Sequence, residues 1–171
     1  VYDMIHSRLN ALHNDYKVDG FLFDCRDAMP YIRESKISGK EFLSRWGSLS
    51  KGFDFCQYTM SGGSGFAPYI HNLRIRGKFD AEFLKQSSAS VVTAGMLGYP
   101  FSTVSADIVS QAELAEINPN LLVRYVQLAA ALPIMNIPFA PWRIDDGKVQ
   151  DNFREAVNIR QRMGAYIGEL V

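Results

Sequence analysis

The amino-acid sequence predicts an α/β protein in which parallel β-strands alternate with helices. Two observations lead to this fold class. Segments with apolar residues three and four positions apart, typical of amphipathic helices, alternate with short apolar runs typical of strands. The run FLFDC at residues 21–25 begins with three consecutive apolar residues. Such a run is expected of a strand that is buried on both faces of a parallel sheet.

The first half of the chain contains two predicted helices and two predicted strands. Apolar side chains recur at helical spacing over residues 2–16, which predicts the first helix, and the strand at 21–25 follows it. The second helix is expected to begin at Ser38. Residues 53–60 (FDFCQYTM) form the second predicted strand, and a loop rich in glycine and serine is expected at 61–68.

The second half contains three predicted helices and two predicted strands. Asp80 is the predicted N-cap of the third helix, and the basic segment before it is interpreted as a loop. A turn, a strand and a loop are expected within residues 96–108. Asn118 caps the next helix, which has a proline at its first position. The last strand is predicted at residues 133–137 (PIMNI), and a long helix at 148–170 closes the chain.

This alternation is compatible with an open doubly wound sheet and with part of a closed (β/α)8 barrel. The predicted strands lack the glycine fingerprint of a dinucleotide-binding fold. In a (β/α)8 barrel, the functional residues stand at the C-terminal ends of the strands. Asp24 stands at such an end, and Asp107 follows a strand in the same way. We therefore expect residues 1–171 to belong to a (β/α)8 TIM barrel.

The chain is expected to cover roughly the second half of that barrel. A complete (β/α)8 barrel takes about 250 residues, whereas this chain has 171 and does not begin with methionine. An isolated half-barrel would leave two open sheet edges. We therefore expect an N-terminal half-barrel or other flanking domains outside this sequence, or a partner that closes the barrel.

Composition and residue spacing exclude several classes of function. The 18 basic residues balance the 18 acidic ones, so no broad positive field attracts nucleic acid. No apolar run is long enough to span a membrane. The histidines, cysteines and carboxylates show no metal-ligand spacing, and no phosphate-binding glycine loop is present. Cys25 and Cys56 lie in apolar runs and are expected to be buried free thiols. We therefore expect no metal, no cofactor and no nucleic-acid partner.

Four segments resemble, in order, parts of glycoside hydrolase family 31. VDGFLFDCRDAMP at 18–30 resembles the family's nucleophile strand, and VVTAGMLGYPFSTVSADIV at 91–109 resembles a later strand. LLVRYVQLAAALPIMNIPFAPWR at 121–143 resembles the next helix and strand, and residues 153–170 resemble the final barrel helix. The motif MLGYPF is similar to the branch that contains the myogenesis-regulating glycosidase. The resemblance extends over the whole chain.

The resemblance implies a retaining α-glycosidase, similar to α-glucosidases or α-galactosidases, that acts on a glycoside or oligosaccharide. Retaining glycosidases use two carboxylates, a nucleophile and an acid/base. Asp24 matches the nucleophile position of the family. Asp27 matches a downstream acid, which either orients Asp24, binds a sugar hydroxyl or is a solvated loop residue. Family members work mostly in the secretory pathway, anchored to membranes or outside the cell, and the same is expected here.

The family's acid/base has no counterpart at the aligned position of this sequence. An alignment counted back from Gly98 without gaps places the family's acid near Leu73, where this sequence has no carboxylate. Asp80 is the nearest candidate, and it requires a shift of about seven residues from that alignment. Without a general acid, the chain would be a catalytically degenerate member that binds a carbohydrate or a protein. The sequence is compatible both with an active glycosidase and with a binding protein that has lost catalysis.

Three further residues are candidates for substrate binding. Asp107 matches an acid of the family and is either a sugar ligand or a loop carboxylate. Arg76 lies where the family's acid is expected and either binds a polar group of the substrate or is solvated. Trp142 is a candidate for stacking on a sugar ring, whereas Trp46, at helical spacing from Phe42, is expected in the core.

Overall fold

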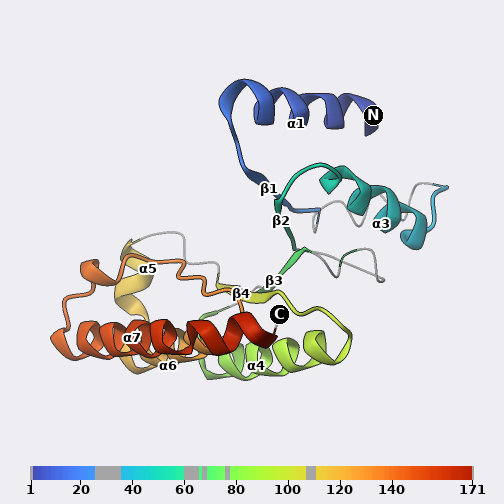
Figure 1. Cartoon of the computed structure of the whole chain (residues 1–171). Helices are drawn as coiled ribbons and strands as arrows, with labels where there is room; N and C mark the ends of the chain where they lie inside the picture. The colour runs from blue at the N-terminus through green and yellow to red at the C-terminus, as the bar shows by residue number, and fades with distance from the viewer. Residues whose placement is uncertain are drawn as a thin grey trace. The chain divides into compact units, whose positions relative to one another are not determined.

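The structure is a computed structural model (Figure 1), and it describes residues 2–25, 36–59, 66, 69–75, 78–106 and 111–170. Asp27, Arg76 and Asp107 lie outside these residues, as does most of the predicted loop at 61–68. The chain forms two compact units, Val1–Asn72 and Leu73–Val171.

The described strands form a four-stranded parallel sheet in the order β1-β2-β3-β4. The strands are β1 (Gly20–Phe23), β2 (Phe55–Tyr58), β3 (Ile70–Ile75) and β4 (Ser102–Ala106). The order in the sheet is therefore the order along the chain. Helices occur between β1 and β2 and between β3 and β4, so the predicted α/β class with parallel strands is confirmed.

In the first unit, one face of β1 and β2 carries a cluster of aromatic rings. Phe23 pairs with Tyr58 across the two strands, and their rings stack with centroids 4.9 Å apart. The hydroxyl of Tyr58 donates a 3.2 Å hydrogen bond to the carbonyl of Gly47, at the end of α3 (Gly39–Gly47). Trp46 of α3 packs edge-on against Phe23, as its expected place in the core requires. These contacts attach α3 to the aromatic face.

The opposite face of β1 and β2 is more open. Leu22 is 53% exposed and Phe55 is 66% exposed. The expectation that β1 is buried on both faces is therefore wrong for the described residues, because the aromatic cluster and α3 cover only one of them. Gly20 has a local role in the pairing of the strands. A Cβ at this position would lie 1.7 Å from the carbonyl oxygen of Phe55, so only glycine fits where β1 and β2 begin.

Both described α-helices of the first unit begin where the sequence predicted. Helix α1 (Tyr2–Tyr16) has the predicted bounds. Helix α3 begins after Ser38, whose hydroxyl accepts a hydrogen bond from the backbone N–H of Glu41 at 3.2 Å. A short 3-10 helix, η2 (Ser48–Ser50), follows α3. The first backbone N–H groups of a helix have no acceptor within the helix. The hydroxyl of Ser38 accepts from one of them and thereby fixes where the helix begins.

The second unit is a core of helices packed on β4. Its helices are α4 (Ala81–Met96), α5 (Gln111–Glu116), α6 (Pro119–Ala131) and α7 (Gly147–Leu170), with a 3-10 helix η4 (Pro141–Arg143). Helices α6 and α7 lie side by side (Figure 1). The predicted caps Asp80 and Asn118 precede α4 and α6, and the predicted final helix is α7. Helix α5 was not predicted.

Tyr125 of α6 joins the core to the backbone around it. Its side chain is completely buried, and its hydroxyl donates to the carbonyls of Val104 in β4 and of Asn136, at 2.9 and 3.1 Å. At the C-terminal end of α6, the guanidinium of Arg160 in α7 donates to the carbonyl of Leu132. These hydrogen bonds connect α6 to the backbone of β4, and α7 to the backbone at the end of α6.

Two of the strand assignments require correction. The segment PIMNI at 133–137 was predicted as a strand but has irregular backbone. It begins with Pro133 and is followed by Pro138, and neither residue has an N–H to donate to a ladder. The segment before Asp80 was interpreted as a loop, yet residues 70–75 of it form β3. Its basic and polar residues do not give the apolar pattern of a strand. The strand forms by pairing with β2 and was therefore missed.

Candidate active site

The C-terminal ends of β1 and β2 are joined by a side-chain hydrogen bond. Asp24 directly follows Phe23, the last residue of β1, and its Oδ1 accepts from the hydroxyl of Thr59 at 2.8 Å. The backbone N–H of Thr59 also donates to the carbonyl of Phe23 at 3.1 Å. Asp24 is exposed and Thr59 is half-buried. The carboxylate is therefore both accessible to a ligand and held in place by a neighbouring strand.

Strand geometry places these two side chains on the more open face of the sheet. Phe23 and Tyr58 are opposite each other on the aromatic face. Because successive side chains of a strand point to opposite faces, the next residues, Asp24 and Thr59, lie on the other face. Ligands of parallel α/β sheets bind at the carboxyl ends of the strands. Asp24 thus has the position that the sequence predicted for it, at the end of a parallel strand.

Asn72 of β3 lies on the same face. Its Nδ2 donates to Oε1 of Gln57 in β2 at 3.3 Å, and its side chain is 4% exposed. Sequence reasoning missed both Thr59 and Asn72. For Thr59 a signal was available, because it comes near the end of the second predicted strand as Asp24 comes near the end of the first. Asn72 gave no such signal, since its strand was interpreted as a loop.

Two cysteines and a histidine of the first unit have shifted pKa values. Burial, reinforced by the negative charge of Asp24, raises the pKa of the Cys25 thiol to about 11. Burial likewise raises the pKa of Cys56 and lowers that of His71. Both cysteines are buried free thiols, as predicted. A protonated thiol is a poor nucleophile and a poor metal ligand, so neither cysteine is a better nucleophile candidate than Asp24.

Asp80 belongs to the second unit, where it caps a helix. Its Oδ1 accepts a 3.0 Å hydrogen bond from the backbone N–H of Phe83, in the first turn of α4. The predicted capping role is confirmed. The same carboxylate was also the candidate acid/base. In the structure this carboxylate oxygen is engaged with the start of α4.

Trp142 also belongs to the second unit. It lies in η4 and is 77% exposed. An exposed indole is available for stacking on a sugar ring or on another flat apolar surface. The three other predicted site residues, Asp27, Arg76 and Asp107, lie outside the described residues, so Asp24 is the part of the predicted site that the structure describes in most detail.

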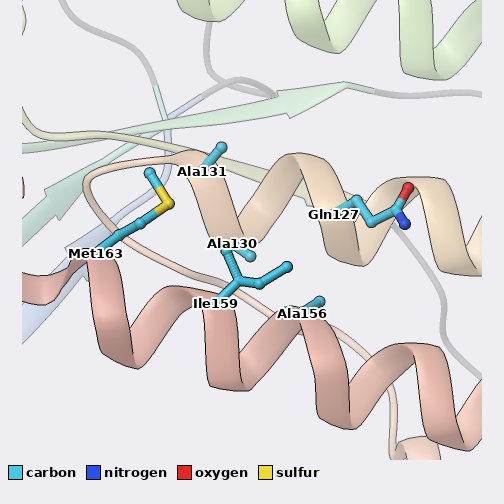
Figure 2. A pocket seen from close by; sticks show the side chains of 6 residues that line it. All are labelled: Gln127, Ala130, Ala131, Ala156, Ile159 and Met163. Carbon is cyan, nitrogen blue, oxygen red and sulfur yellow. The ribbon is translucent and has the colours of Figure 1, made fainter.

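The second unit contains a small apolar pocket between α6 and α7, which Figure 2 shows from close by. Its volume is about 90 Å³, and its lining residues are Gln127, Ala130, Ala131, Ala156, Ile159 and Met163. None of the predicted site residues lines it. Among the described residues, no group of three or more histidines, cysteines or carboxylates is placed to hold a metal ion. None of the described helices is long and apolar enough to cross a membrane.

Fold and site together define a mixed α/β protein with a parallel sheet and an accessible carboxylate at a strand end. No protein-family model matches the chain, and no curated protein matches it. The activity that the sequence resemblance implies therefore rests on the residues themselves.

Proposed function

We propose that the chain is part of a retaining α-glycosidase with Asp24 as the nucleophile. The observation that carries the proposal is the position of Asp24 at the carboxyl end of β1, exposed and hydrogen-bonded to Thr59. The hydroxyl of Thr59 stabilises the charged carboxylate and fixes its orientation, and a glycosidase nucleophile needs both. The resemblance of residues 18–30 to the nucleophile strand of glycoside hydrolase family 31 supports the same role.

The reaction follows from this placement. An oxygen of Asp24 forms a bond to the anomeric carbon while the bond to the leaving oxygen breaks, and a general acid protonates that oxygen. Water then attacks the anomeric carbon of the glycosyl ester, its proton passes to the same acid/base, and Asp24 is released. The two displacements retain the configuration of the sugar.

The order of the strands supports the (β/α)8 barrel as the complete fold. In a doubly wound sheet the strand order reverses at a switch point, whereas successive strands of a (β/α)8 barrel are neighbours throughout. The described strands follow the order β1-β2-β3-β4 without a reversal. In this proposal the remaining strands of the barrel come from sequence outside the chain or from a partner.

A second candidate function is sugar binding without turnover, and the contact of Asp80 with Phe83 favours it. The Asp80 carboxylate is engaged with the helix start as an N-cap. If no other carboxylate protonates the leaving group, catalysis loses about 10²–10⁴-fold. The protein would then retain a carbohydrate site around Asp24 and act as a binding module.

A covalent label distinguishes the two functions. The full-length protein is incubated with activated fluorinated α-glucosyl and α-galactosyl substrates, which trap the glycosyl ester, and the labelled peptide is identified by mass spectrometry. A label on Asp24, absent from the Asp24→Asn variant, together with turnover of an aryl α-glycoside, supports the enzyme. A label on another carboxylate contradicts the assignment of Asp24. No label and no turnover, with sugars still raising the melting temperature, support the binding module.

A further inference from the structure

Three polar side chains from neighbouring strands of the first unit lie in one row. The register pairs Phe23 with Tyr58 and Tyr58 with His71. Advancing this register by one residue aligns Asp24 of β1, Thr59 of β2 and Asn72 of β3. The hydrogen bond between Thr59 and Asp24 agrees with this alignment. All three side chains face away from the aromatic cluster, since side chains alternate along a strand.

Only one of the two polar atoms of the Asn72 side chain has a hydrogen-bond partner among the described residues. Its Nδ2 donates to Gln57, but its Oδ1 is buried and has no hydrogen-bond partner among the residues that the structure describes. A buried acceptor without a donor costs stability, and an unsatisfied group of this kind in a native protein calls for an explanation. A ligand hydroxyl is one donor that would satisfy it. Strands of a sheet are about 4.8 Å apart, so β1 and β3 are separated by roughly 10 Å.

We propose that Asn72 is a second substrate-binding residue, whose Oδ1 accepts a hydrogen bond from a ring hydroxyl of the sugar that Asp24 attacks. The inference rests on the proposed function, since it assigns a ligand to the same face of the sheet. A pyranose with its anomeric carbon at Asp24 extends its other hydroxyls along the row, past Thr59 toward β3. Asn72 then determines which hydroxyl configuration the site accepts.

A purely structural role makes a different prediction. If the Asn72 amide only bridges to Gln57, its replacement changes stability and leaves ligand binding untouched. Asn72→Leu removes the acceptor, and Asn72→Asp keeps an acceptor of nearly the same shape. Ser50→Ala is a matched control, because Ser50 is also buried in the first unit and its hydroxyl donates to the carbonyl of Gly47.

The test measures the dissociation constants of aryl 1-thio-α-glycosides, which bind without being cleaved. The ligands are the glucoside, the galactoside and their single-deoxy derivatives, measured by calorimetry on the full-length protein. We expect one deoxy derivative to bind wild type about tenfold more weakly than its parent. Asn72→Leu should abolish that difference, whereas Asn72→Asp and Ser50→Ala should retain it.

The outcomes separate the two proposals. If wild type is labelled at Asp24 and binds the thioglycosides, yet Asn72→Leu binds every ligand as wild type does, the role of Asn72 is refuted and the glycosidase stands. If wild type is not labelled and binds no glycoside, both proposals fall. If Asn72→Leu does not fold, Asn72→Ala replaces it. A deoxy preference that persists in a folded variant without the acceptor overturns the inference.

Discussion

The hydroxyl of Thr59 donates a 2.8 Å hydrogen bond to Oδ1 of Asp24, between residues that are 35 positions apart in the chain. The backbone joins the same two strands one residue earlier, through the N–H of Thr59 and the carbonyl of Phe23. A side-chain bond that is supported by a ladder bond positions the carboxylate more firmly than a loop contact would. The proposed chemistry depends on this relationship.

Thr59→Val removes the hydroxyl and keeps the shape of the side chain. Without the donor, the charged form of Asp24 loses stabilisation and the carboxylate loses its orientation. We expect kcat/KM for an aryl α-glycoside to fall about tenfold, and the acidic limb of the pH profile to move to higher pH. Thr59→Ser, which retains the hydroxyl, should behave like wild type. A fall in kcat/KM with an unchanged acidic limb would mean that Thr59 does not act through Asp24.

Substitutions of Asp80 separate its two roles. Asp80→Ala removes the acceptor for the N–H of Phe83, and we expect a loss of about 1 kcal/mol in the free energy of unfolding, measured by urea denaturation. Asp80→Asn retains a capping oxygen, so its stability should stay close to that of wild type. If Asp80→Asn is stable but has lost turnover, Asp80 is the acid/base. If Asp80→Asn turns over substrate normally, Asp80 is a cap alone.

Tyr125→Phe tests the buried hydrogen bonds of the second unit. The substitution leaves the carbonyls of Val104 and Asn136 without this donor. We expect the free energy of unfolding to fall by about 1–3 kcal/mol, with a lower melting temperature, since two buried hydrogen bonds are lost. Tyr16→Phe is the matched control, because Tyr16 is 76% exposed, and it should unfold like wild type. Equal stability of the two variants would contradict the role given to Tyr125.

The raised pKa of Cys25 predicts a loss of stability in alkali. Its ordinary pKa is 9.0, and burial raises it to about 11 in the folded protein. Between these values the unfolded chain loses the thiol proton before the folded protein does, so the unfolded state binds fewer protons. This contribution to stability is complete below pH 9 and declines as the pH rises toward 11. Denaturation curves at several pH values should show a smaller decline in Cys25→Ala than in wild type.

The sequence determined the features that depend on neighbours along the chain. The caps at Ser38, Asp80 and Asn118 were all predicted, and each side chain accepts a hydrogen bond from a backbone N–H two or three residues ahead. The spacing of apolar residues also predicted the bounds of α1 and the long α7. These are local interactions, and the residue types that make them are few and specific.

Tertiary structure decided the features that depend on distant partners. Residues 70–75 became a strand by pairing with β2, while the apolar segment at 133–137 did not, although its sequence is the more strand-like of the two. The sequence located Asp24 at the end of a strand. Only the register of β1 on β2 brought Thr59 to it, and only the register of β2 on β3 brought Asn72 into the same row. Hydrogen bonds between strands are made across long sequence separations, so no local pattern of residues specifies which strands pair or in which register.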